Sequence, residues 1–112
     1  MTVSAPVAER RVAVRRKPAV GTVCRFDGPP GLGLIWNIST SGISMLLSET
    51  AAAGSHLEGW LETVDGDDMV RVGLRVAHAR RIETGDYFVG AAFDRPLTDD
   101  ELRPFVAEPF GD

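Results

Sequence analysis

Residues 70–77 read VRVGLRVA, and this stretch decides the kind of fold. Apolar side chains alternate in it with arginines and small residues, which is the period of two of a β-strand with one buried and one mostly wet face. The apolar set is Val70, Val72, Leu74 and Val76. The stretch therefore predicts a sheet that covers a core on one side.

Five further strands are predicted around this one, separated by clusters of turn residues. Their ranges are 20–26, 33–38, 43–48, 57–64 and 87–93. The connections DGPPG, STSG, DGDD and TGD carry the glycine, proline and short polar residues that tight turns need. Six strands at this spacing in 112 residues predict an all-β fold, a closed or nearly closed six-stranded antiparallel β-barrel.

A short helix is predicted to close the barrel within residues 97–107. Thr98 and Glu101 have the spacing of a capping box, and Leu97 with Leu102 can pack across it as a hydrophobic staple. Pro104 would remove a hydrogen bond from the helix interior, so the helix should be short or kinked. We expect it to act as a plug or lid on the barrel end.

The charges are distributed unevenly along the chain. Residues 1–26 hold six basic groups against one acid, whereas the remainder holds six against fifteen. We expect residues 1–8 to be a disordered lead-in and residues 9–18 a flexible basic N-terminal arm, followed by the barrel over 19–96 and the helical closure within one domain of 9–112. A basic arm on an acidic body favours an anionic ligand or an intramolecular tether.

The sequence lacks the signatures of an enzyme or of a metal site. The glycines of GPPGLG precede a strand instead of a helix, so they do not form a phosphate-binding loop. The lone Cys24 is expected to be a buried core thiol, and His56 and His78 are expected at strand ends on the surface. We expect a protein that is not an enzyme, with no metal and no cofactor.

No apolar run in the sequence has the length of a membrane helix or of a signal peptide. The sequence therefore predicts a cytoplasmic protein without membrane insertion.

Two motifs can carry binding chemistry. Arg11 and Arg15 form R-x-x-x-R, and guanidinium groups can clamp phosphates or bind a guanine edge through paired hydrogen bonds. Asn37, Ser39 and Gly42 form N-x-S-x-x-G at the exit of a predicted strand, where an amide, a hydroxyl and a close backbone approach can face a ligand. Taken singly, each motif can also be a solvated basic tail or an ordinary turn.

Together and in this order, the two motifs resemble the PilZ domain family. Arg15 and Asn37 lie twenty-two positions apart, which fits the family spacing. The late strand Val89–Phe93 resembles the family's V-G-x-x-F strand, and LTDDEL at 97–102 occupies the place where its closing helix begins. The resemblance covers residues 9 to about 106 and implies a six-stranded barrel closed by a helix.

The resemblance also implies binding of the bacterial second messenger cyclic di-GMP. Arg11 and Arg15 would grip phosphate and guanine, while Asn37, Ser39 and Gly42 would form the wall on the barrel side. Arg10 and Arg16 are further candidates for ligand contact because the motif lies within a run of cations. Trp36 and Ile38 are expected to belong to the strand and to hold this wall still.

The function expected from these features is that of a non-catalytic receptor, in which ordering of the arm signals to a downstream protein effector. The site could take one or two cyclic di-GMP molecules. An alternative is a protein-interaction adaptor of the same fold that binds no nucleotide. A nonspecific nucleic-acid anchor is disfavoured because the acidic body would repel a long phosphate backbone, so we expect no DNA partner.

Overall fold

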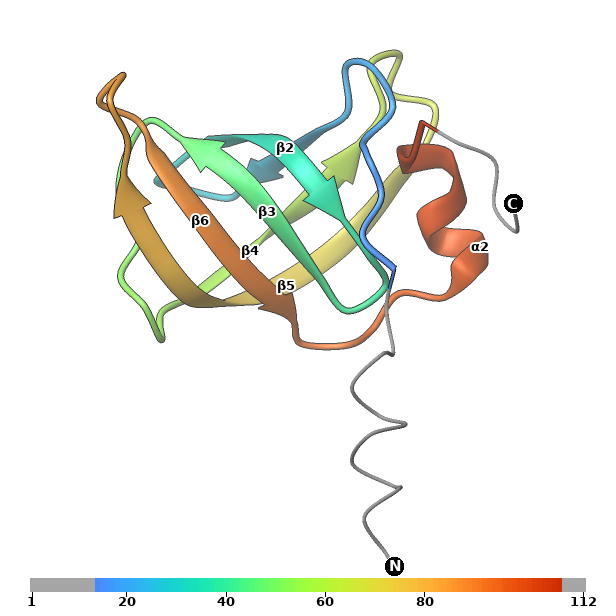
Figure 1. The fold of residues 1–112 in the computed structure, drawn as a ribbon. Coiled ribbons are helices and arrows are strands. Elements are labelled where there is room, and N and C mark those ends of the chain that lie inside the picture. The colour runs from blue at the N-terminus through green and yellow to red at the C-terminus, as the bar shows by residue number, and fades with distance from the viewer. Residues whose placement is uncertain (1–13, 108–112) are drawn as a thin grey trace, which may run out of the picture.

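The computed structural model describes residues 14–107, and six antiparallel strands form a closed barrel within them (Figure 1). Around the barrel the strands follow the order β1-β2-β3-β6-β5-β4. Their bounds are β1 Val23–Phe26, β2 Leu32–Ile38, β3 Gly42–Leu47, β4 His56–Glu62, β5 Met69–Arg81 and β6 Tyr87–Phe93. The predicted all-β barrel with a short C-terminal helix is confirmed.

Most strand boundaries lie within two residues of the predicted ones, and two differ by three or more residues for local reasons. β1 begins at Val23 instead of Val20 because Gly21 has a positive φ of 84°, which interrupts an extended chain. β5 continues past residue 77 to Arg81 because its pairing with β6 shifts register between Val76 and His78. An extra residue of this kind breaks the period of two, so the alternation that identifies the strand stops at the bulge.

The barrel interior is filled by apolar side chains from all six strands. Cys24 lies among them and is fully buried, which confirms the predicted core thiol. Burial raises the pKa of the Cys24 thiol to about 12, since a thiolate is poorly solvated there. His56 opens β4 and is exposed as expected, whereas His78 is exposed in the middle of β5 instead of at a strand end.

The C-terminal helix is as short as Pro104 predicts. α2 spans Asp99–Leu102, and the 3-10 helix η1, Arg103–Phe105, contains the proline. The capping box is present: the Glu101 amide donates to Thr98 Oγ1 over 3.0 Å, and the Thr98 amide donates to the Glu101 carboxylate over 2.9 Å. Leu102 and Phe105 are buried and join the barrel core, so this segment closes one end of the barrel.

Residues 14–19, which we call the strap, lie along β2 and lead toward the C-terminal segment (Figure 1). Along β2, β1 pairs only with Leu32–Leu34, so β1 leaves the edge of the far half of β2 uncovered. Arg16 pairs with Ile38 there through two backbone hydrogen bonds, of 2.9 and 3.0 Å. On the other side, Ala19 donates to the Phe105 carbonyl and Lys17 accepts from the Ala107 amide, each over 2.9 Å.

The strap corrects one expectation about the arm. We expected cyclic di-GMP to fold the stretch from Arg10 to Lys17 onto the barrel, yet residues 14–18 already lie there. Main-chain hydrogen bonds to β2 and to the C-terminal segment hold this part in place. Residues 9–13 lie outside the described residues.

Closure of the barrel between β1 and β4 depends on Gly59. A Cβ at this position would collide with the carbonyl oxygen of Arg25 on the paired strand. We therefore expect Gly59→Ala to lower the free energy of unfolding by about 1–3 kcal/mol, as for an overpacked core.

Urea denaturation measures this change, and Gly28→Ala is the matched control because a Cβ at Gly28 meets no atom within 4 Å. The control should stay within about 0.5 kcal/mol of the wild type. Equal stability of the two variants would mean that β1 and β4 do not approach each other as described.

Candidate functional site

A bulge in β2 determines which side chains face the arm. Ile35 pairs with Met45 and Asn37 pairs with Ser44, so Trp36 is an extra residue on β2. In a strand without this bulge, Trp36 and Ile38 would lie on the same face. In the bulged strand, Ile38 is fully buried while Trp36 is 61% exposed, and Asn37 lies on the outer side of the barrel wall.

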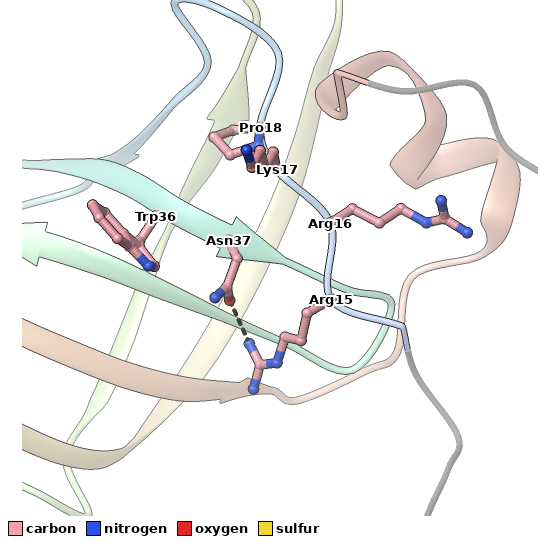
Figure 2. A pocket seen from close by; sticks show the side chains of 6 residues that line it. All are labelled: Arg15, Arg16, Lys17, Pro18, Trp36 and Asn37. Atoms are coloured by element: carbon pink, nitrogen blue, oxygen red, sulfur yellow. Dashed lines mark hydrogen bonds between the residues drawn. The ribbon is translucent and has the colours of Figure 1, made fainter.

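Two of the predicted site residues meet on this outer side. Arg15 Nη1 donates a hydrogen bond of 2.9 Å to Asn37 Oδ1, across twenty-two residues of sequence (Figure 2). The strap brings Arg15 there, because the backbone pairing of Arg16 with Ile38 fixes the neighbouring residue beside β2. The spacing of the two motifs therefore corresponds to a contact in the structure.

An open cavity of about 530 Å³ lies beside this contact. Its lining combines the strap with the bulged part of β2: Arg15, Arg16, Lys17, Pro18, Trp36 and Asn37. Figure 2 shows Arg15 turned toward Asn37, whereas the Arg16 side chain extends away from it, on the side of the C-terminal helix. Arg15 is thus the arginine of the described strap that points at the wall.

Sequence reasoning missed three of the residues that line the cavity, Lys17, Pro18 and Trp36. We expected Trp36 to support the strand, but its side chain is largely exposed and lines the cavity. A bulge cannot be located from one sequence, and strict alternation places Trp36 on the same face as the buried Ile38. The available signal was its position directly before the motif asparagine.

Ser39 lies inside the loop that follows β2. It is fully buried, and its Oγ accepts hydrogen bonds from the backbone amides of Ser41, at 3.1 Å, and Gly42, at 3.2 Å. The Ser39 amide also donates to the Gly42 carbonyl over 2.9 Å. These bonds make Ser39 the centre of the turn, and it does not line the cavity. Ligand contact by Ser39 stays a prediction.

Gly42 has a packing role in the structure. A Cβ on it would stand 2.5 Å from the carbonyl oxygen of Ala91, so only glycine lets β3 approach β6 this closely. The glycine of the motif thus fits a close backbone approach, here by the neighbouring strand. Ligand contact by Gly42 also stays a prediction.

The remaining predicted site residues, Arg10 and Arg11, lie outside the described residues. Within residues 14–107, no three acidic, histidine or cysteine side chains come together as a possible metal site. Among these same residues, no helix is long and apolar enough to cross a membrane.

The cavity suits an anion that carries flat rings. Its lining holds three cationic side chains, one exposed indole and one amide, and none of the six lining residues is a carboxylate or a histidine. Guanidinium groups bind phosphates and guanine edges through charge-assisted hydrogen bonds, worth about 1.5–3 kcal/mol each. An indole face stacks on bases, and a side-chain amide both donates and accepts.

The turn formed by Ser39 can be tested without any ligand. Ser39→Ala leaves the amides of Ser41 and Gly42 without their acceptor in a protected loop, so we expect the free energy of unfolding to fall by about 1–3 kcal/mol. The matched control is Ser48→Ala, since Ser48 is exposed just after β3. An unchanged stability of Ser39→Ala in thermal or urea unfolding would contradict the structural role.

Comparison with known proteins finds a similar fold but no similar sequence. No protein-family model matches the chain, and no curated protein matches it by sequence. Among solved structures, the chain is similar to the Bacillus subtilis inhibitor of motility (MotI/DgrA), with a TM-score of 0.58 and 16% sequence identity. The likeness covers 82% of this chain and 46% of that one, so this chain spans about half the length of the structure it matches. At this identity the likeness concerns the fold.

Proposed function

We propose that the chain binds cyclic di-GMP at the cavity between the strap and β2 and acts as a non-catalytic receptor that relays the signal to a partner protein. One observation carries the proposal: the arginine and the asparagine of the two PilZ-like motifs are hydrogen-bonded over 2.9 Å at the edge of a cationic cavity. Two weak motifs that meet in space are a more specific signal than either motif in the sequence.

The ligand and the cavity have complementary chemistry. Cyclic di-GMP is a dianion with two guanines, and the cavity offers Arg15 and Lys17 for the phosphates and the indole of Trp36 for a guanine ring. The amide of Asn37 can hydrogen-bond a base edge once Arg15 exchanges its contact with Asn37 for one with the ligand. We infer that Arg11 completes the grip from the arm.

The expected affinity follows from these contacts. Micromolar binding requires about 8 kcal/mol. Three or four charge-assisted hydrogen bonds of about 1.5–3 kcal/mol supply this before the ordering cost is subtracted. Because residues 14–18 already lie on the barrel, that cost falls mainly on the ligand and on any further residues it engages. We expect a Kd in the micromolar range or below.

The adaptor part of the proposal is supported by the fold and by the role of one protein whose solved structure resembles it. The structure similar to this chain belongs to an inhibitor of motility, and we transfer only the class of role, that of a regulator. Among the described residues that line the cavity, there is no acid, histidine, serine or cysteine that could act as a nucleophile or a base. A receptor that leaves its ligand unchanged fits such a lining.

An adaptor that binds no nucleotide is the second candidate. The buried position of Ser39 and the packing role of Gly42 favour it, since both motif residues are explained here without a ligand. The two candidates differ in one measurable property, which is nucleotide binding by the purified protein.

Calorimetric titration of cyclic di-GMP into the full-length chain tests the proposal. We expect Arg15→Ala to weaken binding by about 10- to 150-fold, because one charge-assisted contact is lost. Arg75→Ala is the matched control, since Arg75 is exposed on β5 and bonds only the Gly54 carbonyl in the described contacts. Cyclic di-AMP serves as the ligand control for recognition of guanine.

The nucleotide-binding proposal fails if the wild type gives no heat, or if Arg15→Ala and the wild type bind equally. In the first case the second candidate takes its place.

The role of Trp36 gives a separate prediction. We expect Trp36→Ala to weaken cyclic di-GMP binding by about 5- to 150-fold, which corresponds to one stacked base at about 1–3 kcal/mol. Trp60→Ala is the control, because Trp60 lies on β4, away from the cavity lining. In a Trp60→Phe background, the ligand should also change the fluorescence of Trp36. Equal affinities of Trp36→Ala and Trp60→Ala would exclude stacking on Trp36.

A further inference from the structure

The outer face of β2, β3 and β6 carries a continuous set of apolar side chains, which we call the outer apolar face. Leu34 pairs with Leu46, and Leu46 pairs with Phe88, so three strands contribute to one row. Along β2, Leu32, Leu34 and Trp36 are 41%, 54% and 61% exposed. The face comprises Leu32, Leu34, Trp36, Leu46 and Phe88 from these strands, together with Ile82, which directly follows β5. Exposed apolar patches of this kind mark interaction sites.

Two shallow hollows adjoin on this face, with Leu46 shared between them. One, of about 250 Å³, is lined mainly by Leu32, Leu34, Leu46 and Leu47, and the other, of about 290 Å³, by Trp36, Leu46, Ile82, Phe88 and Arg80. The rings of Trp36 and Phe88 meet edge to face, with centroids 6.4 Å apart. The face is thus shaped to receive at least two apolar side chains.

In the part of the chain that the structure describes, three cations stand around the face without acidic partners. Arg80 stacks over the Phe88 ring at 5.5 Å, and Arg15 and Lys17 stand at the adjoining cavity. Within residues 14–107, none of these three cations is ion-paired. Arginines elsewhere on the barrel do form salt bridges with carboxylates, in the pairs Arg25–Glu62, Arg71–Asp27 and Arg95–Glu101. One acid, Asp86, lines the smaller hollow and accepts a hydrogen bond from Thr84.

We propose that the outer apolar face docks an acidic amphipathic segment of a partner protein. Two apolar side chains of that segment fill the hollows beside Leu46, and its carboxylates pair with Arg80 and with the cations of the strap. A second copy of this chain fits less well, because a two-fold contact would set the same cations against each other. The inference rests on the adaptor half of the proposed function and does not require nucleotide binding.

The partner chemistry can be selected from a random peptide library displayed on phage. The full-length wild type is immobilised, and an excess of Leu34→Asp in solution removes peptides that bind elsewhere. Leu34 suits this purpose because its side chain is more than half exposed, so the exchange leaves the core untouched. We expect the enriched peptides to combine large apolar residues with Asp or Glu.

Fluorescence anisotropy of one synthesised peptide then gives the affinities. We expect Leu34→Asp to weaken binding about tenfold or more, as for a residue central to an interface, and Arg80→Ala to weaken it and reduce its salt dependence. Trp60→Ala, on the other side of the barrel, should bind as the wild type does. Urea unfolding of each variant checks that it is folded.

Three results would overturn the proposal. They are the absence of enriched peptides, the enrichment of basic or uncharged ones, and equal binding by Leu34→Asp. Self-association of the wild type in light scattering that Leu34→Asp abolishes would assign the face to a second copy instead. Titration of cyclic di-GMP into Leu34→Asp separates the two proposals, because this exchange should leave nucleotide affinity unchanged.

Discussion

The single extra residue in β2 decides on which side of the barrel wall the side chains of Asn37 and Ile38 lie. Because Trp36 has no partner on β3, the strand changes face between Ile35 and Asn37. Ile38 then enters the core, and Asn37 is presented to Arg15. A strand without the bulge would hide the asparagine or expose the isoleucine, and the cavity would lose its wall. The site is therefore a consequence of strand register as much as of residue identity.

Trp36 also belongs to two surfaces at once. It lines the cavity beside Arg15 and the hollow beside Phe88, so a ligand that fixes the indole changes one wall of the apolar face. The strap adds a second connection, since its backbone is bonded to Ile38 on one side and to Phe105 and Ala107 on the other. If binding at one proposed site changes the affinity of the other through these residues, linkage requires the effect to be equal in both directions.

The sequence predicts the fold well because its signals are local. Alternation identifies the strands, and Thr98, Glu101 and Pro104 set the start and the end of the short helix. The pairing of Arg15 with Asn37 could be inferred only through the resemblance to a family, since no local pattern joins residues so far apart. The placement of Trp36 and Ile38 on opposite faces and the extension of β5 were missed because both depend on bulges, which arise from cross-strand packing. Docking of the strap was missed because it depends on the open edge left by a short β1.

The buried thiol gives the barrel a built-in reporter of its own opening. Cys24 is the only cysteine of the chain, it is fully enclosed, and its raised pKa keeps it protonated at neutral pH. A thiol reagent can therefore reach a reactive sulfur only when β1 separates from its neighbours. The rate of modification measures how often this happens, in the native chain and without a label. Any molecule that binds across the strap and β2 will be visible as a slower loss of one thiol.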